Sequence, residues 1–325
     1  MREGGTEMIE YYSSYGPFFS EYIEFKRSLG YRYKYEYVFT AFDRFLLENN
    51  VTNIGLTRKI CDQWGQKRPN ESDVTRYKRI NDIRNFSIYL NGAGYPSYVP
   101  RQVHQYKTTF IPYIFTKEEI DQFFRACDSL QFTPNSITTH IYPAVFRLIY
   151  GCGLRANEAL SIKCGDINLD NKYIIIREPK NGEDRMLPIS DSLVETLKLY
   201  KNCYRNGAKE KDFFFVKLNG DRCSSETMYE WFRKILRIAG ISHGGKGHGP
   251  CVHSFRHSFS VHSLAAMSDA GLDLYYCLPL LSKYLGHKSL EATDKYVRLT
   301  ADMYPGIMDD MNQLCSYVFP EVGKA

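Results

Sequence analysis

A stretch rich in glycine and proline interrupts the sequence between residues 92 and 114 and divides it into two parts. Two glycines and three prolines lie among its polar and basic residues: Gly92, Gly94, Pro96, Pro100 and Pro112. These residue types break regular structure, so the stretch indicates a linker. A helix can begin again at Thr116, because Thr116 and Glu119 form a capping box before IDQFFRAC. We therefore expect two domains that meet near residue 110.

The part before the linker has the pattern of a helical bundle. Apolar residues recur at helical spacing over 17–30, 34–50, 56–68 and 73–90. Thr57 and Ser72 stand where the third and fourth helices would begin, and their side chains suit the N-cap position. Four helices with short connections make a small bundle.

The part after the linker is expected to be mainly helical with a small antiparallel sheet. KYIIIRE and RMLPI flank a turn at residues 179–184, and the Asn181-Gly182 pair in that turn is a strong hairpin signal. A short helix should begin at Arg155. Further helices are expected at about 190–204, 225–239, 253–270, 278–285 and 288–299.

Positive charge is concentrated around the third and fourth helices and the linker. The chain carries a net charge of +5, whereas residues 51–107 hold ten Lys or Arg against four Asp or Glu, a net charge of +6. Such a segment suits a polyanion such as DNA, although a solvated helix face explains the charge equally well. The residues that we expect to contact DNA are Lys67, Arg68, Arg76, Lys78, Arg79, Arg84, Arg101 and Lys107.

The nine cysteines favour free thiols over disulfides. They are scattered, and none forms a Cys-x-x-Cys pair. The first twelve residues do not resemble a signal peptide, and no apolar run is long enough to cross a bilayer. These features predict a reduced, cytoplasmic protein without a membrane segment.

Four separated pieces of the second domain together suit the cleavage of a phosphodiester. They are GLRANEAL (153–160), PKNGEDR (179–185), HSFRHSF (253–259) and LGHKSLEATDKY (285–296). Cleavage needs donors on the non-bridging oxygens, where negative charge develops. Arginine fits this need, because its guanidinium binds phosphate through two parallel hydrogen bonds and stays charged. Arg155 and Arg256 could form such a pair, and His287 could add a further hydrogen bond.

The remaining groups could move protons. A tyrosine phenol, with a pKa of about 10, needs a nearby acceptor before it can attack. His253 could serve Tyr296 in this way. The departing 5′-oxygen needs a proton donor, and Lys180 on the expected hairpin could reach it.

Each piece alone also has a purely structural interpretation. Arg155 could pair with Glu158 on the surface, and Lys180 could be a solvated turn lysine. His253 and Arg256 are spaced i, i+3 and therefore share a helix face, which is common by chance. Tyr296 is one of 26 tyrosines. The functional interpretation depends on the combination.

In this order, the four pieces resemble the catalytic domain of the tyrosine recombinases over about residues 112–300. The matching residues are Gly153-Leu154-Arg155 with Glu158, Lys180, His253, Arg256, Leu285-Gly286-His287 and Tyr296. The hairpin also resembles the family's in carrying Arg185 and Pro188 after the lysine. Residues 1–110 resemble the family's helical, SAM-like core-binding domain in shape and charge, and 301–325 would be a C-terminal tail.

The resemblance implies a site-specific recombinase or integrase that works through a 3′-phosphotyrosine bond. Tyr296 would be the nucleophile, Arg155 and Arg256 would hold the phosphate with His287, and His253 would handle the nucleophile's proton. The residue that would protonate the leaving oxygen is Lys180, and the one that would orient the arginine helix is Glu158. No metal or cofactor is implied, and the partner would be duplex DNA bound by a tetramer on two sites.

Three departures from the family pattern stand out. Phe255 replaces the usual leucine, and Arg298 follows the tyrosine where many members have histidine. Arg256 and His287 are 31 residues apart, and the extra residues fall in SDAGLDLYYCLP. None of these changes removes a catalytic group.

Alternatives remain open at this point. A type IB topoisomerase uses similar chemistry, and a non-cleaving DNA-binding protein could share the fold. The helical bundle and the tail favour a recombinase over a topoisomerase, and the expected absence of an extra N-terminal arm-binding domain favours the simple or transposon type. A zinc site is a weaker alternative, suggested by the density of histidine and cysteine at His243, His248, Cys251, His253, His257 and His262, whose spacing fits no standard finger. The apolar tail could fold on its own domain or dock on a neighbouring protomer.

Overall fold

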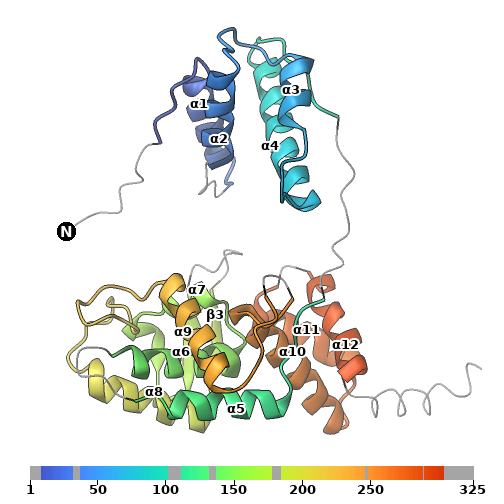
Figure 1. The fold of residues 1–325 in the computed structure, drawn as a ribbon. Coiled ribbons are helices and arrows are strands. Elements are labelled where there is room, and N and C mark those ends of the chain that lie inside the picture. The colour runs from blue at the N-terminus through green and yellow to red at the C-terminus, as the bar shows by residue number, and fades with distance from the viewer. Residues whose placement is uncertain are drawn as a thin grey trace, which may run out of the picture. The chain divides into compact units, whose positions relative to one another are not determined.

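The computed structural model describes residues 9–31, 37–101, 111–131, 137–177, 184–245, 248–287 and 289–303. The chain forms two compact units, Met1–Phe110 and Ile111–Ala325. The expectation of a mainly α protein with a small antiparallel sheet is confirmed (Figure 1).

Among its described residues, the first unit contains four helices, α1 to α4, with an aromatic core. Their bounds are α1 Gly16–Ser28, α2 Tyr37–Glu48, α3 Arg58–Trp64 and α4 Asp73–Gly92. Phe19, Phe39 and Phe86 are fully buried at the centre, and their ring centroids lie 4.9–5.6 Å apart. Such edge-on and tilted ring contacts are the favoured geometry for aromatic pairs.

The starts of these helices follow from local capping. Thr57 accepts a hydrogen bond from the backbone N–H of Ile60, and Ser72 accepts one from Thr75, as expected for N-cap residues. α3 is shorter than the predicted helix. It ends at Trp64, and the chain then leads to α4.

The second unit contains eight further α-helices and three strands among its described residues. The helices are α5 Lys117–Asp128, α6 Thr138–Cys152, α7 Ala156–Leu160, α8 Asp191–Tyr204, α9 Ser225–Ile238, α10 Val252–Asp269, α11 Leu274–Leu285 and α12 Glu291–Met303. The capping box at Thr116 and Glu119 is present, as expected. α10 packs against α6, α11 and α12, so it is the helix around which this unit is built.

The sheet has three antiparallel strands in the order β1, β2, β3. β2 (Tyr173–Ile176) pairs with β3 (Arg185–Pro188) in the register Ile174 to Leu187, which confirms the hairpin pairing. β1 (Ile167–Asn168) was not predicted, because a two-residue strand leaves no periodic pattern to detect. The turn at 178–183, which includes Lys180, lies outside the described residues.

Two hydrophobic cores fill the second unit. The larger one joins α5 to α10 and the sheet, with Phe123, Phe146 and Phe255 fully buried in it. A smaller core lies between α10, α11 and α12 and contains Leu264, Leu281 and Tyr296. The nucleophile that we expected therefore belongs to a core and does not project from the surface.

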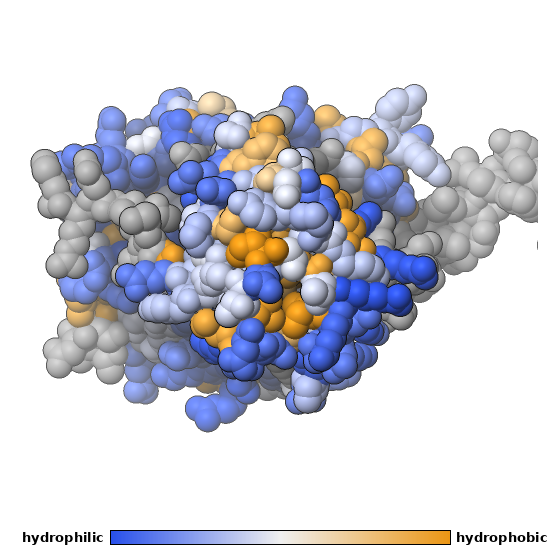
Figure 2. Space-filling model, turned by 90° about the horizontal axis from the view of Figure 1, so that it is seen from above, coloured by the Kyte–Doolittle hydropathy of each residue, from blue (hydrophilic) through white to orange (hydrophobic). Residues whose placement is uncertain are grey.

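The surface mixes hydrophilic side chains with small groups of hydrophobic ones, as one face of the molecule shows (Figure 2). In the part of the chain that the structure describes, no helix is both long and apolar enough to cross a membrane.

Candidate active site

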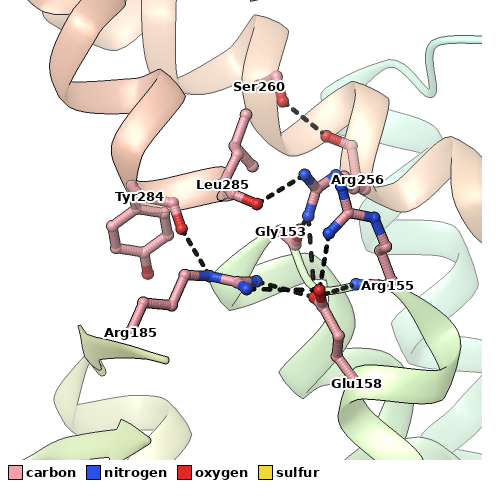
Figure 3. A network of polar contacts seen from close by, with 8 residues as sticks. All are labelled: Gly153, Arg155, Glu158, Arg185, Arg256, Ser260, Tyr284 and Leu285. Atoms are coloured by element: carbon pink, nitrogen blue, oxygen red, sulfur yellow. Dashed lines mark hydrogen bonds and ion pairs between the residues drawn. The ribbon is translucent and has the colours of Figure 1, made fainter. Parts of the chain in front are cut away.

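Three arginines from distant parts of the sequence converge on the carboxylate of Glu158 (Figure 3). Arg155 Nη1 lies 2.7 Å from Glu158 Oε1, and Arg185 Nη2 lies 2.8 Å from Oε2. Arg256 Nη1 lies 3.9 Å from the same Oε2. Burial raises the pKa of Glu158, but its hydrogen bonds and charge contacts with Arg185 and Arg155 outweigh burial and hold the pKa below its usual value. Glu158 is therefore an ionised anchor for the cluster.

The backbone around Arg155 explains how this anchor forms. Gly153 ends α6 in the left-handed conformation (φ 58°), and a Cβ there would lie within 3 Å of Phe259 and Leu285 side-chain atoms. Arg155 then occupies the N-cap position of α7, and its backbone N–H donates to Glu158 Oε2 at 3.0 Å. The GLR sequence thus makes a tight turn that presents Arg155, while Glu158 secures the start of the next helix.

Arg256 is fixed by main-chain carbonyls. Its Nη1 donates to Gly153 O and its Nη2 to Leu285 O, both at 2.7 Å. The side chain is only 1% exposed. Burial and the neighbouring Arg155 lower its pKa to about 10, so it stays protonated at neutral pH. This guanidinium, which comes from α10, therefore connects that helix to the C-terminal ends of α6 and α11.

Arg185 is the third member of the cluster, and it enters from β3. Its Nε donates to Tyr284 O at 3.0 Å while its guanidinium grips Glu158. Gly286 makes room for it, because a Cβ there would lie 3.0 Å from Arg185 Nη1. The sequence placed Arg185 only as a hairpin residue, and its role beside Glu158 emerges from the structure.

Three histidines lie next to the arginine cluster. His253 and His257 are one turn apart on α10, and their ring centroids are 4.6 Å apart. His287 follows α11, and its Nδ1 is hydrogen-bonded to Thr293 Oγ1 at 2.8 Å, where Thr293 is fully buried. The Gly286 turn and this bond together set the orientation of the His287 ring.

Tyr296 meets these histidines from α12. Its hydroxyl lies 2.8 Å from His257 Nδ1, and its ring stacks on His287 with centroids 6.3 Å apart. We had expected His253 to handle this hydroxyl, but among the described residues His257 is the histidine bonded to it. Lys295 Nζ lies 5.2 Å from the centroid of the Tyr296 ring.

The electrostatics of the site keep the histidines neutral. Burial and nearby positive charge lower the pKa of His257 to about 3 and that of His287 to about 4. Part of His253 is open to solvent, yet desolvation by the surrounding protein, Arg256 and Arg155 lower its pKa to about 4. Burial raises the pKa of Tyr296, and Arg256 opposes that shift. The site is therefore strongly positive around a protonated phenol.

The structure brings most of the expected site residues into this one place and adds two that were missed. The expected residues that meet here are Arg155, Glu158, His253, Arg256, His287 and Tyr296. The missed residues are His257 and Lys295, besides Arg185, which the sequence had placed only on the hairpin. His257 follows Arg256 directly and is spaced i, i+4 from His253, so helical periodicity could have indicated a shared face.

The basic residues expected to contact DNA have differing environments in the first unit. Arg79 is 4% exposed, and its guanidinium is occupied by Glu71 and the carbonyls of Trp64 and Gln66, so we leave it out of the proposed contacts. Arg76 donates to Gly65 O, whereas Lys78 and Arg101 are exposed. Three more, Lys67, Arg68 and Arg84, are at or near the surface, and Lys107 lies outside the described residues.

The histidine- and cysteine-rich stretch at 243–262 does not gather as a zinc finger would. Among the described residues, no group of three or more His, Cys, Asp or Glu side chains is placed to hold a metal ion. His262 instead bonds Tyr150 through Nδ1 at 2.9 Å, and His243 bonds Tyr229 at 3.0 Å.

The sequence of the second unit matches a known family. Residues 114–303 match the model of the phage integrase family. The chain is 27% identical over 288 residues to a putative integrase/recombinase, y4rB, of Sinorhizobium fredii, covering 85% of this chain and 90% of that one. It is 32% identical over 157 residues to the tyrosine recombinase XerA of Pyrococcus furiosus, which is 47% of this chain and about half of XerA (49%).

Solved structures share the fold. The Tn1549 transposon integrase in complex with a circular intermediate DNA superposes with a TM-score of 0.61 at 16% identity, covering 86% of this chain and 93% of that one. A lambda integrase dimer bound to a COC′ core site gives a TM-score of 0.59 at 16% identity, with coverage of 86% and 94%. The chain therefore belongs to the phage integrase family and is a tyrosine-type site-specific DNA recombinase.

Proposed function

We propose that Tyr296 cleaves DNA by attacking a backbone phosphorus. Its phenolic oxygen forms a bond to phosphorus, the bond from phosphorus to the 5′-oxygen breaks, and a 3′-phosphotyrosine and a free 5′-hydroxyl result. The phosphotyrosine ester conserves the energy of the broken phosphodiester bond. A 5′-hydroxyl can therefore attack this ester, rejoin the DNA strand and release Tyr296. The observation that carries the proposal is the meeting of a tyrosine hydroxyl with a cluster of arginines and neutral histidines in one site.

The arginines and His287 would stabilise the transition state. Arg155 is the more exposed of the two expected phosphate ligands, with 23% of its side chain exposed. Its guanidinium can therefore donate hydrogen bonds to an incoming phosphate. Arg256 adds fixed positive charge behind it. Donors that are already oriented need no reorganisation as negative charge develops on the non-bridging oxygens.

Neutral histidines suit the proton transfer from the phenol. With a pKa of about 4, His253 is free to accept a proton at neutral pH, and it lies within the same group of rings as Tyr296. We retain His253 as the candidate base during cleavage. Lys180 is proposed, from the sequence alone, to protonate the leaving 5′-oxygen.

The first unit and the tail are proposed to serve binding and assembly. The expected basic residues other than Arg79, which lie on α4, in the loop before it and in the linker, would contact phosphates of duplex DNA. The tail at 304–325 lies outside the described residues, and we propose that it docks on a neighbouring protomer in a tetramer on two DNA sites. The DNA-binding proposal draws on the DNA complexes of the Tn1549 and lambda integrases, whereas the docking proposal rests on the apolar residues of the tail.

A type IB topoisomerase-like enzyme and a non-cleaving DNA-binding protein are the alternatives. The first would relax supercoiled DNA without pairing two sites. The second would bind DNA without a covalent adduct. Synapsis of two DNA sites would therefore exclude the topoisomerase-like enzyme, and formation of a covalent adduct would exclude the non-cleaving protein.

Adduct formation on a suicide substrate tests the central proposal. A nicked duplex loses its short 5′-hydroxyl strand after cleavage, so the covalent complex accumulates and is resolved on a denaturing gel. Tyr296→Phe should bind DNA but form no adduct. Tyr275→Phe, at a tyrosine that is 80% exposed on α11, is the matched control and should form the adduct normally. An adduct with Tyr296→Phe would refute the assignment.

A further inference from the structure

Tyr296 is enclosed in the small core between α10, α11 and α12. The whole residue is 1% exposed, and it shares this core with Val261, Leu264, Leu281 and Leu285. A phosphate of a DNA duplex cannot approach an oxygen that is covered in this way. The phenol must therefore move before it can attack.

A short polar contact opposes that movement from the α10 side. His257 Nδ1 and the Tyr296 hydroxyl are 2.8 Å apart, and His257 is itself only 6% exposed. His253 contacts the His257 ring edge-on, at an interplanar angle of 85°. The acceptor is thus packed against a second ring and shielded from water that could replace it.

The charges around His257 fix which partner donates. Positive groups face the pair from several elements: Arg256 on α10, Lys295 on α12 and Arg155 at the start of α7. The neighbouring His287 is itself neutral. The positive groups disfavour a protonated imidazole, so His257 is neutral, whereas the phenol keeps its proton. We therefore assign the bond as Tyr296 O–H donating to Nδ1, with the ring proton of His257 on Nε2.

We propose that His257 is a positioning residue that stores the nucleophile in the DNA-free protein. It holds the Tyr296 hydroxyl inside the small core, and this bond breaks when Tyr296 moves to the phosphate. The proposal rests on the proposed function, in which Tyr296 is the nucleophile. It differs from the role given to His253, because storage precedes the chemical step while a base acts within it.

Two substitutions of His257 test whether it acts as a hydrogen-bond acceptor or only packs against its neighbours. His257→Asn keeps an amide oxygen near the position of Nδ1, whereas His257→Gln places its amide near the position of Nε2. The reporter is 3-fluorotyrosine incorporated at position 296 of the full-length, DNA-free protein and observed by ¹⁹F NMR. The same label at position 275 gives the reference for an exposed ring.

We expect His257→Gln to shift the position-296 resonance towards the exposed reference, and His257→Asn to stay nearer the wild type. A hydrogen bond of this kind contributes about 1 kcal/mol, which corresponds to roughly a 5-fold change in an equilibrium. On the suicide substrate His257→Gln should therefore cleave a few-fold faster in the first turnover. Cleavage slower by about 100-fold or more would overturn storage in favour of a base in the chemical step. An unshifted resonance would also overturn it.

A second measurement does not depend on the folding of His257 variants. In ¹⁵N-histidine spectra the His257 Nδ1 should report an unprotonated acceptor, and Tyr296→Phe should shift that signal. No shift, or a proton on Nδ1, contradicts the proposal. If the wild type forms no adduct but these spectra respond as expected, the proposed function fails while the stored tyrosine stands.

Discussion

The arginine cluster and the tyrosine side of the site are built in different ways. Arg185 and Arg256 are held by charge contacts with Glu158 and by main-chain carbonyls of Tyr284, Gly153 and Leu285. Tyr296 is held by a hydrogen bond to His257 and by packing in a small core. The arginine cluster, which we propose to bind the phosphate, is therefore already in place without DNA, whereas Tyr296, the proposed nucleophile, would have to move.

This difference suits the chemistry of each half. Preorganised donors stabilise a transition state only if they do not have to move during the reaction. A nucleophile has the opposite requirement, because an exposed reactive group could act before the correct partner strand is in place. Storage of Tyr296 would make cleavage depend on binding.

The largest expected effect distinguishes a residue that protonates the leaving group, Lys180, from one that stabilises the non-bridging oxygens, Arg155. Lys180→Ala should slow cleavage of normal DNA by roughly 100- to 10,000-fold, because the 5′-alkoxide leaves poorly without an acid. Replacing the bridging oxygen with sulfur gives a thiolate leaving group with a pKa of about 8.5, which needs no acid. The sulfur substrate should restore Lys180→Ala but not Arg155→Ala. Equal rescue of both, or of neither, would remove Lys180 as the acid.

The next effect tests whether the arginine half is truly fixed by Glu158. Glu158→Gln keeps the shape but leaves buried arginines without a counter-charge, so we expect the free energy of unfolding to fall by roughly 3–5 kcal/mol. Asp128→Asn is the control, because its pair with Arg147 is on the surface and should contribute about 0–1 kcal/mol. Urea denaturation measures both. Similar small decreases in the two variants would show that the cluster does not depend on Glu158.

Much of the fold could be predicted, because its signals are local. The caps at Thr57, Ser72 and Thr116 and the hairpin strands depend on residues a few positions apart. The start of α11 was wrong by four residues: the helix begins at Leu274, not 278. Pro279 favours a start nearby, since proline fits the first helical turn, but Asp273 caps the helix earlier by accepting from Tyr275 N–H.

The site was predictable in its members but less so in its contacts. The resemblance of four ordered pieces to the tyrosine recombinases identified Arg155, Arg256 and Tyr296 together. Which histidine bonds the phenol depends on how α12 packs on α10, and the two bonded residues are 39 positions apart. No local pattern carries that information, so His257 had to come from the structure.

The pH dependence of stability should show whether folding keeps His257 neutral in the tyrosine half of the site, which consists of Tyr296 and the histidines around it. The pKa of His257 falls from an ordinary 6.5 to about 3, so the folded state binds fewer protons than the unfolded state between those values. This contribution is complete above pH 6.5 and is lost progressively as the pH falls towards about 3. The melting temperature of the wild type should thus drop more steeply over that interval than that of His257→Asn. A shift of about three pKa units corresponds to about 4 kcal/mol, so the excess drop should be on the order of 10 °C, at about 2–4 °C per kcal/mol. Parallel curves would mean that His257 is not held neutral by folding.

The smallest expected effect concerns Lys295, which links the two halves. Partial burial and Arg256 lower its pKa, and its charge in turn lowers the pKa values of His253, His257 and His287. A cation held next to Arg256 suits a phosphate, so Lys295 should add one ionic interaction with bound DNA.

Salt dependence measures such an interaction directly. For each phosphate that a variant no longer neutralises, the slope of log K against log salt becomes shallower by about 0.9. Lys295→Gln should show this change on duplex DNA, while Lys198→Gln, which removes the same charge from α8, should not. Because Lys295 also opposes histidine protonation, its removal should raise the pKa values of the neighbouring histidines slightly in ¹⁵N spectra. An unchanged slope with shifted histidines would assign Lys295 to the tyrosine half alone, and the phosphate would then be held only by the arginine half.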